Sequence, residues 1–434
     1  MHLTEEQMLT LAPDEASKKS GKDLASPSKW QNLSGSEIAV WGECQGSGSK
    51  PYQTSIDLSN IAFKCSCPSR KFPCKHGIAL GLMYARNAKS FGKMEPPAWV
   101  SDWLQKRTTK EEKKADDKES KPVDAEAQAK RQANRENKVK DGVEELIIWI
   151  KDLIRNGILS APEKGYAFWG NMSRRMIDAQ APGLAGMLKS LGDTDFFREG
   201  WESVFLERLL DLYLVSKSYH HFDAVPELIK QDIRTWIGFT ISQDELKTQK
   251  GITDHWMVLG KSSSTDDNIT TERFWLYGNQ SKNYALVLQF IVRGQTANIL
   301  LSPGMVIEAE LVYFPSVTPM RALIKNYNTV SVQVAAEPYP SLQAVAEYQS
   351  LLYAAFPVQT EKPYIVQKLT PVKYNGKWLL KDAQGFTAAI PTRFKAFWKL
   401  LSISGGQPMD MAVIGKENEF EPIGVWAENK YLLL

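Results

Sequence analysis

The chain has 434 residues, enough for about three domains. Its 43% hydrophobic and 24% charged residues are ordinary for globular protein and exclude a fibrous or wholly disordered chain. The formal net charge of +3 neither indicates nor excludes a nucleic-acid partner, and no apolar run approaches the ~18 residues of a membrane span.

The first hundred residues predict a small α+β module. Two short helices are expected first, at 5–11 and 14–25, and Asp14 is a suitable N-terminal residue for the second. Alternating apolar and polar residues then predict strands, and a 3.6-residue period predicts a helix after them. These strands and the helix are expected at 38–44, 51–58, 61–64 and 76–88.

The segment Phe63–Gly77 holds three of the four cysteines and one of the five histidines of the chain. Its candidate ligands form two close pairs, Cys65 with Cys67 and Cys74 with His76, separated by a short loop. Thiolate sulfur and neutral imidazole are donors that suit a tetrahedral zinc ion. The sequence therefore predicts one structural Zn²⁺ ion bound by all four side chains, with no coordination position left for a water molecule.

Two other interpretations of the cysteines are weaker. A disulfide framework is disfavoured because Met1–Gln7 lacks the basic and apolar segments of a signal peptide, so we expect a cytoplasmic protein with reduced thiols. A catalytic Cys74–His76 dyad would leave Cys65 and Cys67 without a role. The fourth cysteine, Cys44, is interpreted as a small buried side chain on a strand rather than a fifth ligand.

The spacing Cys-x-Cys…Cys-x-His resembles the SWIM zinc finger, a family named from chromatin-remodelling ATPases and plant Mutator-type transposases and widespread in bacteria. The four predicted ligands fall on the four metal positions of that family. The longer run 41–76 is similar to an uncharacterised bacterial SWIM family. This resemblance implies a module that binds DNA or protein. By analogy it also implies a MoxR-type AAA+ ATPase or a von Willebrand A protein as partner.

The predicted finger is surrounded by basic side chains. No Asp or Glu occurs between Asn60 and Met94, and three thiolates around Zn²⁺ require only one or two nearby cations. The chain supplies more than that, which fits phosphate groups or an acidic protein surface, although a merely solvated face is a third interpretation. The predicted partner-binding residues are Lys64, Arg70, Lys71, Lys75, Arg86, Lys89 and Lys93.

The remaining chain predicts further parts after the finger module of residues 1–104. Residues 105–142 are charged and lack aromatic residues, which predicts a flexible linker, either disordered or a solvated helix. Residues 143–240 predict an α-helical domain, and 250–335 predict a β-rich domain, an antiparallel barrel or sandwich. Residues 338–434 predict a C-terminal α+β piece. The expected fold class is thus α+β multidomain, with a small zinc-stabilised ββα finger.

The predicted function is that of a zinc-binding interaction protein. Its finger would recognise nucleic acid or a protein partner, as an accessory to a bacterial ATPase system. The alternative is an enzyme with an active site in residues 161–434. The first is favoured because the sequence contains no P-loop, Rossmann glycine fingerprint, zinc-protease motif or nucleophile elbow.

Overall fold

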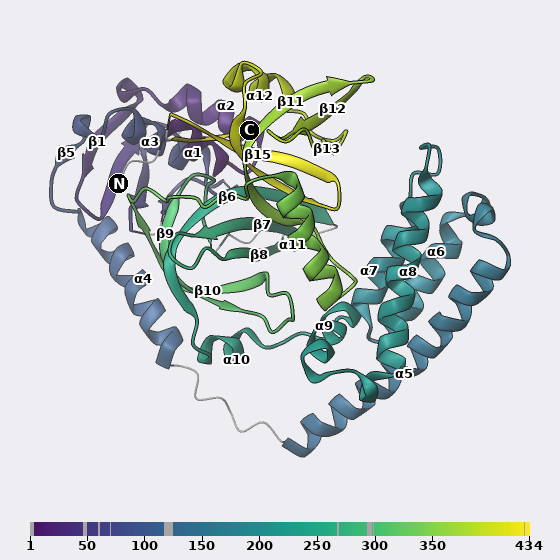
Figure 1. The fold of residues 1–434 in the computed structure, drawn as a ribbon. Helices are drawn as coiled ribbons and strands as arrows, with labels where there is room; N and C mark the ends of the chain where they lie inside the picture. Colours follow the sequence, from purple (N-terminus) through teal and green to yellow (C-terminus); the bar gives the residue numbers. More distant parts are fainter. Residues whose placement is uncertain are drawn as a thin grey trace.

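The computed structural model describes residues 4–46, 50–59, 61–69, 71–116, 125–266, 269–292, 297, 299–428 and 430–434. Figure 1 shows an N-terminal module packed beside a β-barrel, with a C-terminal sheet over the barrel. A group of helices lies to one side of these parts. Within the described residues no helix is both long and apolar enough to cross a bilayer.

The N-terminal module is a five-stranded sheet covered by helices, in the order β4-β3-β2-β1-β5. Its helices are α1 (Glu5–Thr10), α2 (Glu15–Leu24) and α3 (Lys75–Arg86). Its strands are β1 (Trp30–Gly35), β2 (Ala39–Cys44), β3 (Tyr52–Asp57), β4 (Ala62–Cys65) and β5 (Gly92–Lys93). The expected helices and three strands lie close to their predicted positions.

Local sequence fixes the two N-terminal helices. Thr4 and Gln7 form a capping box at the start of α1, and Asp14 accepts a 2.7 Å hydrogen bond from the Ser17 amide at the start of α2. Both helices pack on α3 at close range. A Cβ atom added to Gly81 of α3 would lie 2.1 Å from the terminal methyl group of Met8, so that side chain would have to shift.

Strand β1 is an element that the sequence did not predict. It pairs with β2, but the register shifts between Gln31 and Ser34, and Asn32 has a φ of 53°. Such a bulge breaks the two-residue alternation that identifies a strand in a sequence. The finger's sheet is therefore wider than the expected ββα unit.

The β-rich region forms a closed barrel, in the order β10-β8-β7-β6-β9. Its strands are β6 (Ile252–Asp266), β7 (Ile269–Gly278), β8 (Tyr284–Val292), β9 (Val306–Tyr313) and β10 (Arg321–Val330). All the pairings are antiparallel except β8 with β10, which is parallel. This connectivity is that of a Greek-key barrel of the OB type. Of the two expected forms, barrel and sandwich, the barrel is present.

The N-terminal module and the barrel share one hydrophobic core. Met8 and Ile78 from the module and Trp256 and Leu301 from the barrel are all fully buried in the same cluster. Backbone contacts join them as well, since the Thr329 amide donates to the Ser59 carbonyl at 3.1 Å. The two parts therefore form a single body, called the finger–barrel body below.

The C-terminal piece is a six-stranded sheet with two helices. Its helices are α11 (Leu342–Ala355) and α12 (Phe397–Ser404). Its strands are β11 (Lys362–Tyr374), β12 (Lys377–Lys381), β13 (Thr387–Ala389), β14 (Met409–Lys416), β15 (Glu419–Ala427) and β16 (Lys430–Leu433). It covers the outer face of the barrel, where the Ile365 amide donates to the Tyr284 hydroxyl at 3.0 Å.

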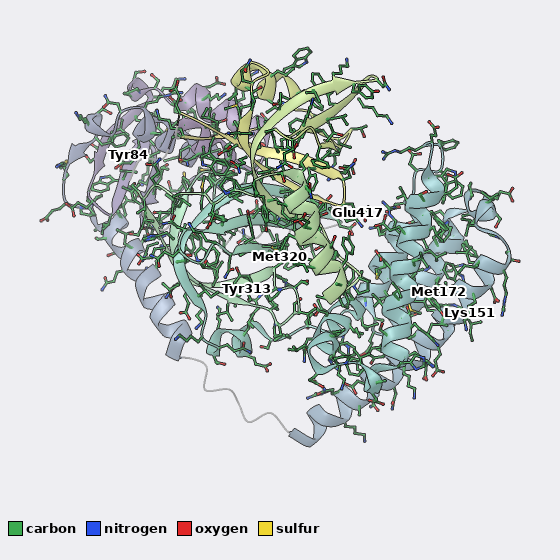
Figure 2. All side chains as sticks on the ribbon, viewed as in Figure 1. Tyr84, Lys151, Met172, Tyr313, Met320 and Glu417 are labelled. Carbon is green, nitrogen blue, oxygen red and sulfur yellow. The ribbon has the colours of Figure 1, made fainter. Side chains whose placement is uncertain are left out.

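The helical region forms a bundle with a core of its own. Its helices are α5 (Ala125–Arg155), α6 (Tyr166–Asp178), α7 (Pro182–Gly192), α8 (Trp201–His220), α9 (Glu227–Ile237) and, next to the barrel, α10 (Gln243–Thr248). Figure 2 places Met172 and Lys151 on this bundle, away from the barrel. Only Phe356, Val358 and Val317 enter its core from elsewhere among the described residues.

Helices occupy the described residues of the linker expected at 105–142, and residues 117–124 lie outside the described part. Helix α4 (Ala98–Asp116) contains the first residues of that expected linker, and α5 begins at Ala125, well before residue 142. Val139 is fully buried in the bundle core. Arg135 donates to the Gly238 carbonyl at 3.0 Å and lies 4.3 Å from the Phe239 ring centre. Helix α5 therefore continues through this polar segment, because Arg135 and Val139 contact residues that are distant in the sequence.

Candidate metal centre

Three cysteines and one histidine converge where β4 ends and α3 begins. Cys65 is the last residue of β4, and its partner across the sheet is Thr54 of β3. Cys74 is the N-cap residue of α3, and His76 lies in the first turn of that helix. The strand end and the helix start therefore present two ligand pairs to one point, as the sequence predicted.

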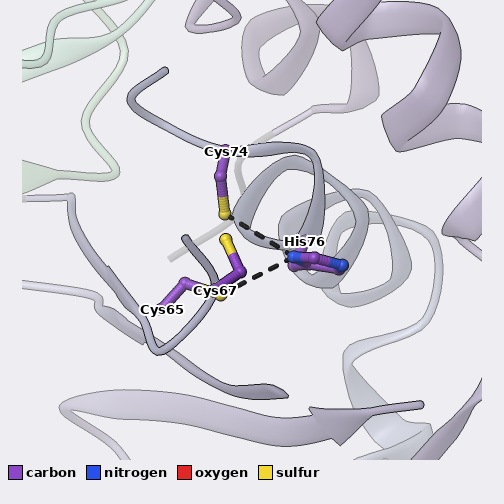
Figure 3. A group of neighbouring side chains, drawn as sticks. All are labelled: Cys65, Cys67, Cys74 and His76. Atoms are coloured by element: carbon purple, nitrogen blue, oxygen red, sulfur yellow. Dashed lines mark hydrogen bonds between the residues drawn. The ribbon is translucent and has the colours of Figure 1, made fainter. Parts of the chain in front are cut away.

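The geometry fits a tetrahedral zinc site. The four ligand atoms all lie within 4.8 Å of one another. The Nδ1 atom of His76 is 3.7 Å from the Cys65 sulfur and 3.9 Å from the Cys74 sulfur, as Figure 3 shows. With Zn–S bonds of about 2.3 Å and Zn–N bonds of about 2.0 Å, the S···N edge of a tetrahedron is about 3.5 Å. Cys65, Cys67, Cys74 and His76 thus form a Cys₃His group that can hold one zinc ion.

The electrostatics of the group also favour a cation. Cys74 and His76 are buried, and the other two ligands are half-buried. A hydrogen bond from the Cys65 thiol lowers the pKa of Cys74 to about 4, while the same pairing and burial raise the pKa of Cys65. Three thiols so close together cannot all ionise without a compensating charge, and Zn²⁺ supplies it.

Cys44 lies outside the metal group. It is fully buried on β2, and burial raises the pKa of its thiol. A neutral thiol in an apolar core agrees with its interpretation as a small hydrophobic residue.

The N-terminal helices engage part of the predicted basic surface. Lys71 pairs with Asp14 at 2.7 Å, and this hydrogen bond lowers the pKa of Asp14 to about 2. Arg86 pairs with Glu5 at 2.8 Å. In the sequence, these partners are visible only as acidic residues at the starts of two predicted helices. The fold shows that these helices, α1 and α2, lie over α3.

The other predicted cations are spread around the module. Lys64 donates to the Trp99 carbonyl at 3.1 Å, and Arg70 lies outside the described residues. Lys75, Lys89 and Lys93 are exposed and have no ion pair within the part of the chain that the structure describes. Because α3 has 12 residues, Lys75 and Lys89 are separated by about 18 Å or more along it.

One cavity adjoins the metal group, and a second adjoins the loop between its two ligand pairs. The first, of about 600 Å³, is lined by Ser17 and Ser20 of α2, by Lys75 and by the ligands Cys67 and His76. The second, of about 1560 Å³, lies between the finger module, the barrel and the C-terminal sheet. Lys71 lines both cavities, so they meet at the zinc loop, defined here as residues 66–73.

A cluster of carboxylates in residues 161–434 bears on the alternative of an enzyme. Burial raises the pKa of Asp211 on α8 to about 6. Its neighbours Glu207, Lys416 and Glu417 include an ion pair between Lys416 and Glu207. Figure 2 shows Glu417 on the side of the C-terminal sheet that faces the bundle. These groups line neither cavity, and the ion pair between Lys416 and Glu207 joins the bundle to the C-terminal sheet.

Comparison with known families identifies two segments of the chain. The family model of the SWIM zinc finger matches residues 52–85, and that of the SWIM-associated four-helix bundle domain matches residues 134–237. No curated protein and no solved structure matches the chain. The first match contains all four ligands, and the second spans α5 to α9. The chain therefore carries a SWIM zinc finger with a Cys₃His group together with the helical bundle that accompanies such fingers.

Proposed function

We propose that this protein is an interaction protein whose zinc-stabilised SWIM finger binds an anionic partner, either nucleic acid or an acidic protein surface. The observation that carries the proposal is the Cys₃His group at the start of α3 together with the exposed lysines Lys75, Lys89 and Lys93 of the same module. Four protein ligands fill a tetrahedral zinc shell, so the metal would be structural and no water would be activated.

The exposed lysines Lys75, Lys89 and Lys93 support the choice of an anionic partner. They remain exposed although Glu5 and Asp14 engage two neighbouring cations. Rigid presentation by a metal-fixed helix lowers the entropy lost on binding. For a protein partner, the resemblance to bacterial SWIM proteins suggests a MoxR-type AAA+ ATPase or a von Willebrand A protein.

The test is capture of partners from native lysate by the full-length protein, with and without nuclease. The variant K75A/K89A/K93A should retain one zinc per chain and lose most of the capture. The control K138A/K140A removes two exposed lysines of α5 and should capture as the unmodified protein does. Loss of the captured material after nuclease treatment indicates nucleic acid. Undiminished capture by the triple variant would contradict the proposal.

A further inference from the structure

The second cavity is a groove with three walls from distant parts of the sequence. Glu15, Lys18 and Lys22 of α2, with Lys71 and Phe72 of the zinc loop, line one wall. Strands β6 and β7 line another, and the segment around Lys395 before α12 lines the third. With about 1560 Å³, the groove is larger than a typical small-molecule pocket of about 300–1,000 Å³. It therefore suits an extended ligand.

The carboxylates of the groove are mostly compensated within the protein, because its five glutamates pair with four cations. Five glutamates line it, and each has an ion-pair partner among the described residues. These pairs are Glu6 with Lys399, Glu15 with Lys18, Glu272 with Lys261, and Glu361 and Glu421 with Arg393.

Three lining cations have no such ion pair in the described part of the chain. Lys22 and Lys395 are exposed, and half-buried Arg273 donates to the Ser264 hydroxyl at 2.8 Å. The groove thus has an uncompensated positive charge contributed by all three of its walls. This excess favours a ligand that carries negative charges along its length.

The uncharged side chains that line the groove favour a ligand with phosphates and bases over one that carries only carboxylates. Ser262, Ser263 and Ser264 of β6 are exposed and line the groove. Because side chains alternate along a strand, Ser262 and Ser264 share one face, and such hydroxyl groups donate readily to phosphate oxygens. Phe72 lies half-buried at the edge of the zinc loop and offers a ring to which a base can pack. A single strand can bend and unstack to enter such a groove, whereas a duplex is stiff.

We propose that this groove binds single-stranded nucleic acid, with phosphates at Lys22, Arg273 and Lys395 and a base against Phe72. The inference rests on the proposed role as an interaction protein. It places the contact at the cations of the groove rather than at Lys75, Lys89 and Lys93. The zinc ion holds the loop that carries Phe72, so the metal shapes one wall of the groove. A site of this kind accommodates about four nucleotides or more.

The experiment is a fluorescence anisotropy titration of the full-length zinc-loaded protein. The probes are fluorescein-labelled oligothymidylate and oligouridylate of about 12 nucleotides, a DNA duplex of equal length and a polyglutamate peptide. K22A/K395A should weaken single-strand binding roughly tenfold or more. Its plot of log affinity against log salt should be shallower by about 1.4, because each phosphate contact contributes about 0.7. K138A/K140A is the matched control and should bind normally.

Several outcomes separate this inference from the proposed function. No binding of either single strand at low salt, or equal binding of the duplex, overturns the groove assignment. The groove assignment is also overturned if polyglutamate binds, K22A/K395A abolishes that binding, and the oligonucleotides do not bind. If K89A/K93A weakens single-strand binding and K22A/K395A does not, the groove inference fails and the proposed function stands. Binding lost in K22A/K395A, with lysate capture unchanged in K75A/K89A/K93A, supports the groove and contradicts the proposed finger surface.

Discussion

The zinc finger and the helical bundle are both identified as SWIM-associated, yet they are stabilised in different ways. The finger shares its core with the barrel, and a four-ligand metal group joins its sheet to its helix. The bundle has an independent core in which Trp169 packs against Trp149, Phe168 and Phe205. It is attached to the rest through a small set of contacts, including Asp232 and Glu207. Metal binding should therefore control the stability of one body and leave the other unaffected.

Loss of the metal gives the largest expected effect. Cys74→Ser should abolish zinc binding and unfold the finger–barrel body, because structural zinc contributes on the order of 10 kcal/mol to folding, as much as a typical domain's total stability. The bundle should stay folded. Metal analysis measures the loss of zinc. Hydrogen exchange of α5 to α9 measures whether the bundle stays folded.

The matched control for that variant is Cys44→Ala, which removes a buried thiol outside the metal group and should retain one zinc per chain. Stoichiometric zinc in Cys74→Ser would contradict the metal assignment. Loss of amide protection in the bundle would show that the two bodies unfold together, so that the distinction between them fails.

A smaller effect is expected where the bundle joins the barrel. Buried Asp232 of α9 accepts hydrogen bonds from the Ser316 hydroxyl at 2.6 Å and the Val317 amide at 2.9 Å. Asp232→Ala leaves these donors without that acceptor and should cost about 1–3 kcal/mol. Hydrogen exchange of residues 314–320 should quicken while zinc content is unchanged.

The variant Asp232→Asn retains one acceptor oxygen and should lose less than Asp232→Ala. Equal exchange of residues 314–320 in the unmodified protein and Asp232→Ala would show that this contact does not anchor the bundle.

The smallest expected effect is a pH dependence of the bundle's stability. It arises at Asp211, beside the ion pair of Glu207 with Lys416 that joins the bundle to the C-terminal sheet. Burial raises the pKa of Asp211 to about 6, so the folded state favours the protonated form. The resulting stabilisation is fully present below the unfolded-state pKa of about 4 and is lost as pH rises through about 6. Asp211→Asn should therefore have the higher Tm for the bundle above pH ~6, and this difference should shrink towards pH ~4. A constant difference in Tm across that range would show that Asp211 does not titrate as described.

The metal ligands could be predicted from sequence because their chemistry and spacing are local. The main strands were predictable for the same reason, since alternation is a local pattern. The failures are non-local. Residues 125–142 look like a tether until Arg135 meets Phe239 and Val139 enters the bundle core. A bulge and the positive φ of Asn32 hide β1.

The candidate binding surface was the least predictable feature. A count of lysines around the cysteines cannot show that Asp14 and Glu5 lie against two of the cations. The groove was invisible because Lys22, Arg273 and Lys395 come from three separate parts of the chain. Their proximity depends on the tertiary fold rather than on any motif.

The shared core of the finger and barrel has a consequence for how the chain is made. Its two halves are separated in sequence by the whole bundle, so the finger leaves the ribosome long before its barrel partner exists. At roughly 5–20 residues per second, synthesis of the intervening helices takes on the order of ten seconds. During that interval the side chains of Met8 and Leu11 have no barrel to cover them, whereas the bundle core lacks only Val317, Phe356 and Val358 among its described residues. Early capture of zinc would stabilise the nascent finger through this delay. A truncated chain that stops before Ile252 would leave that apolar surface permanently open to aggregation.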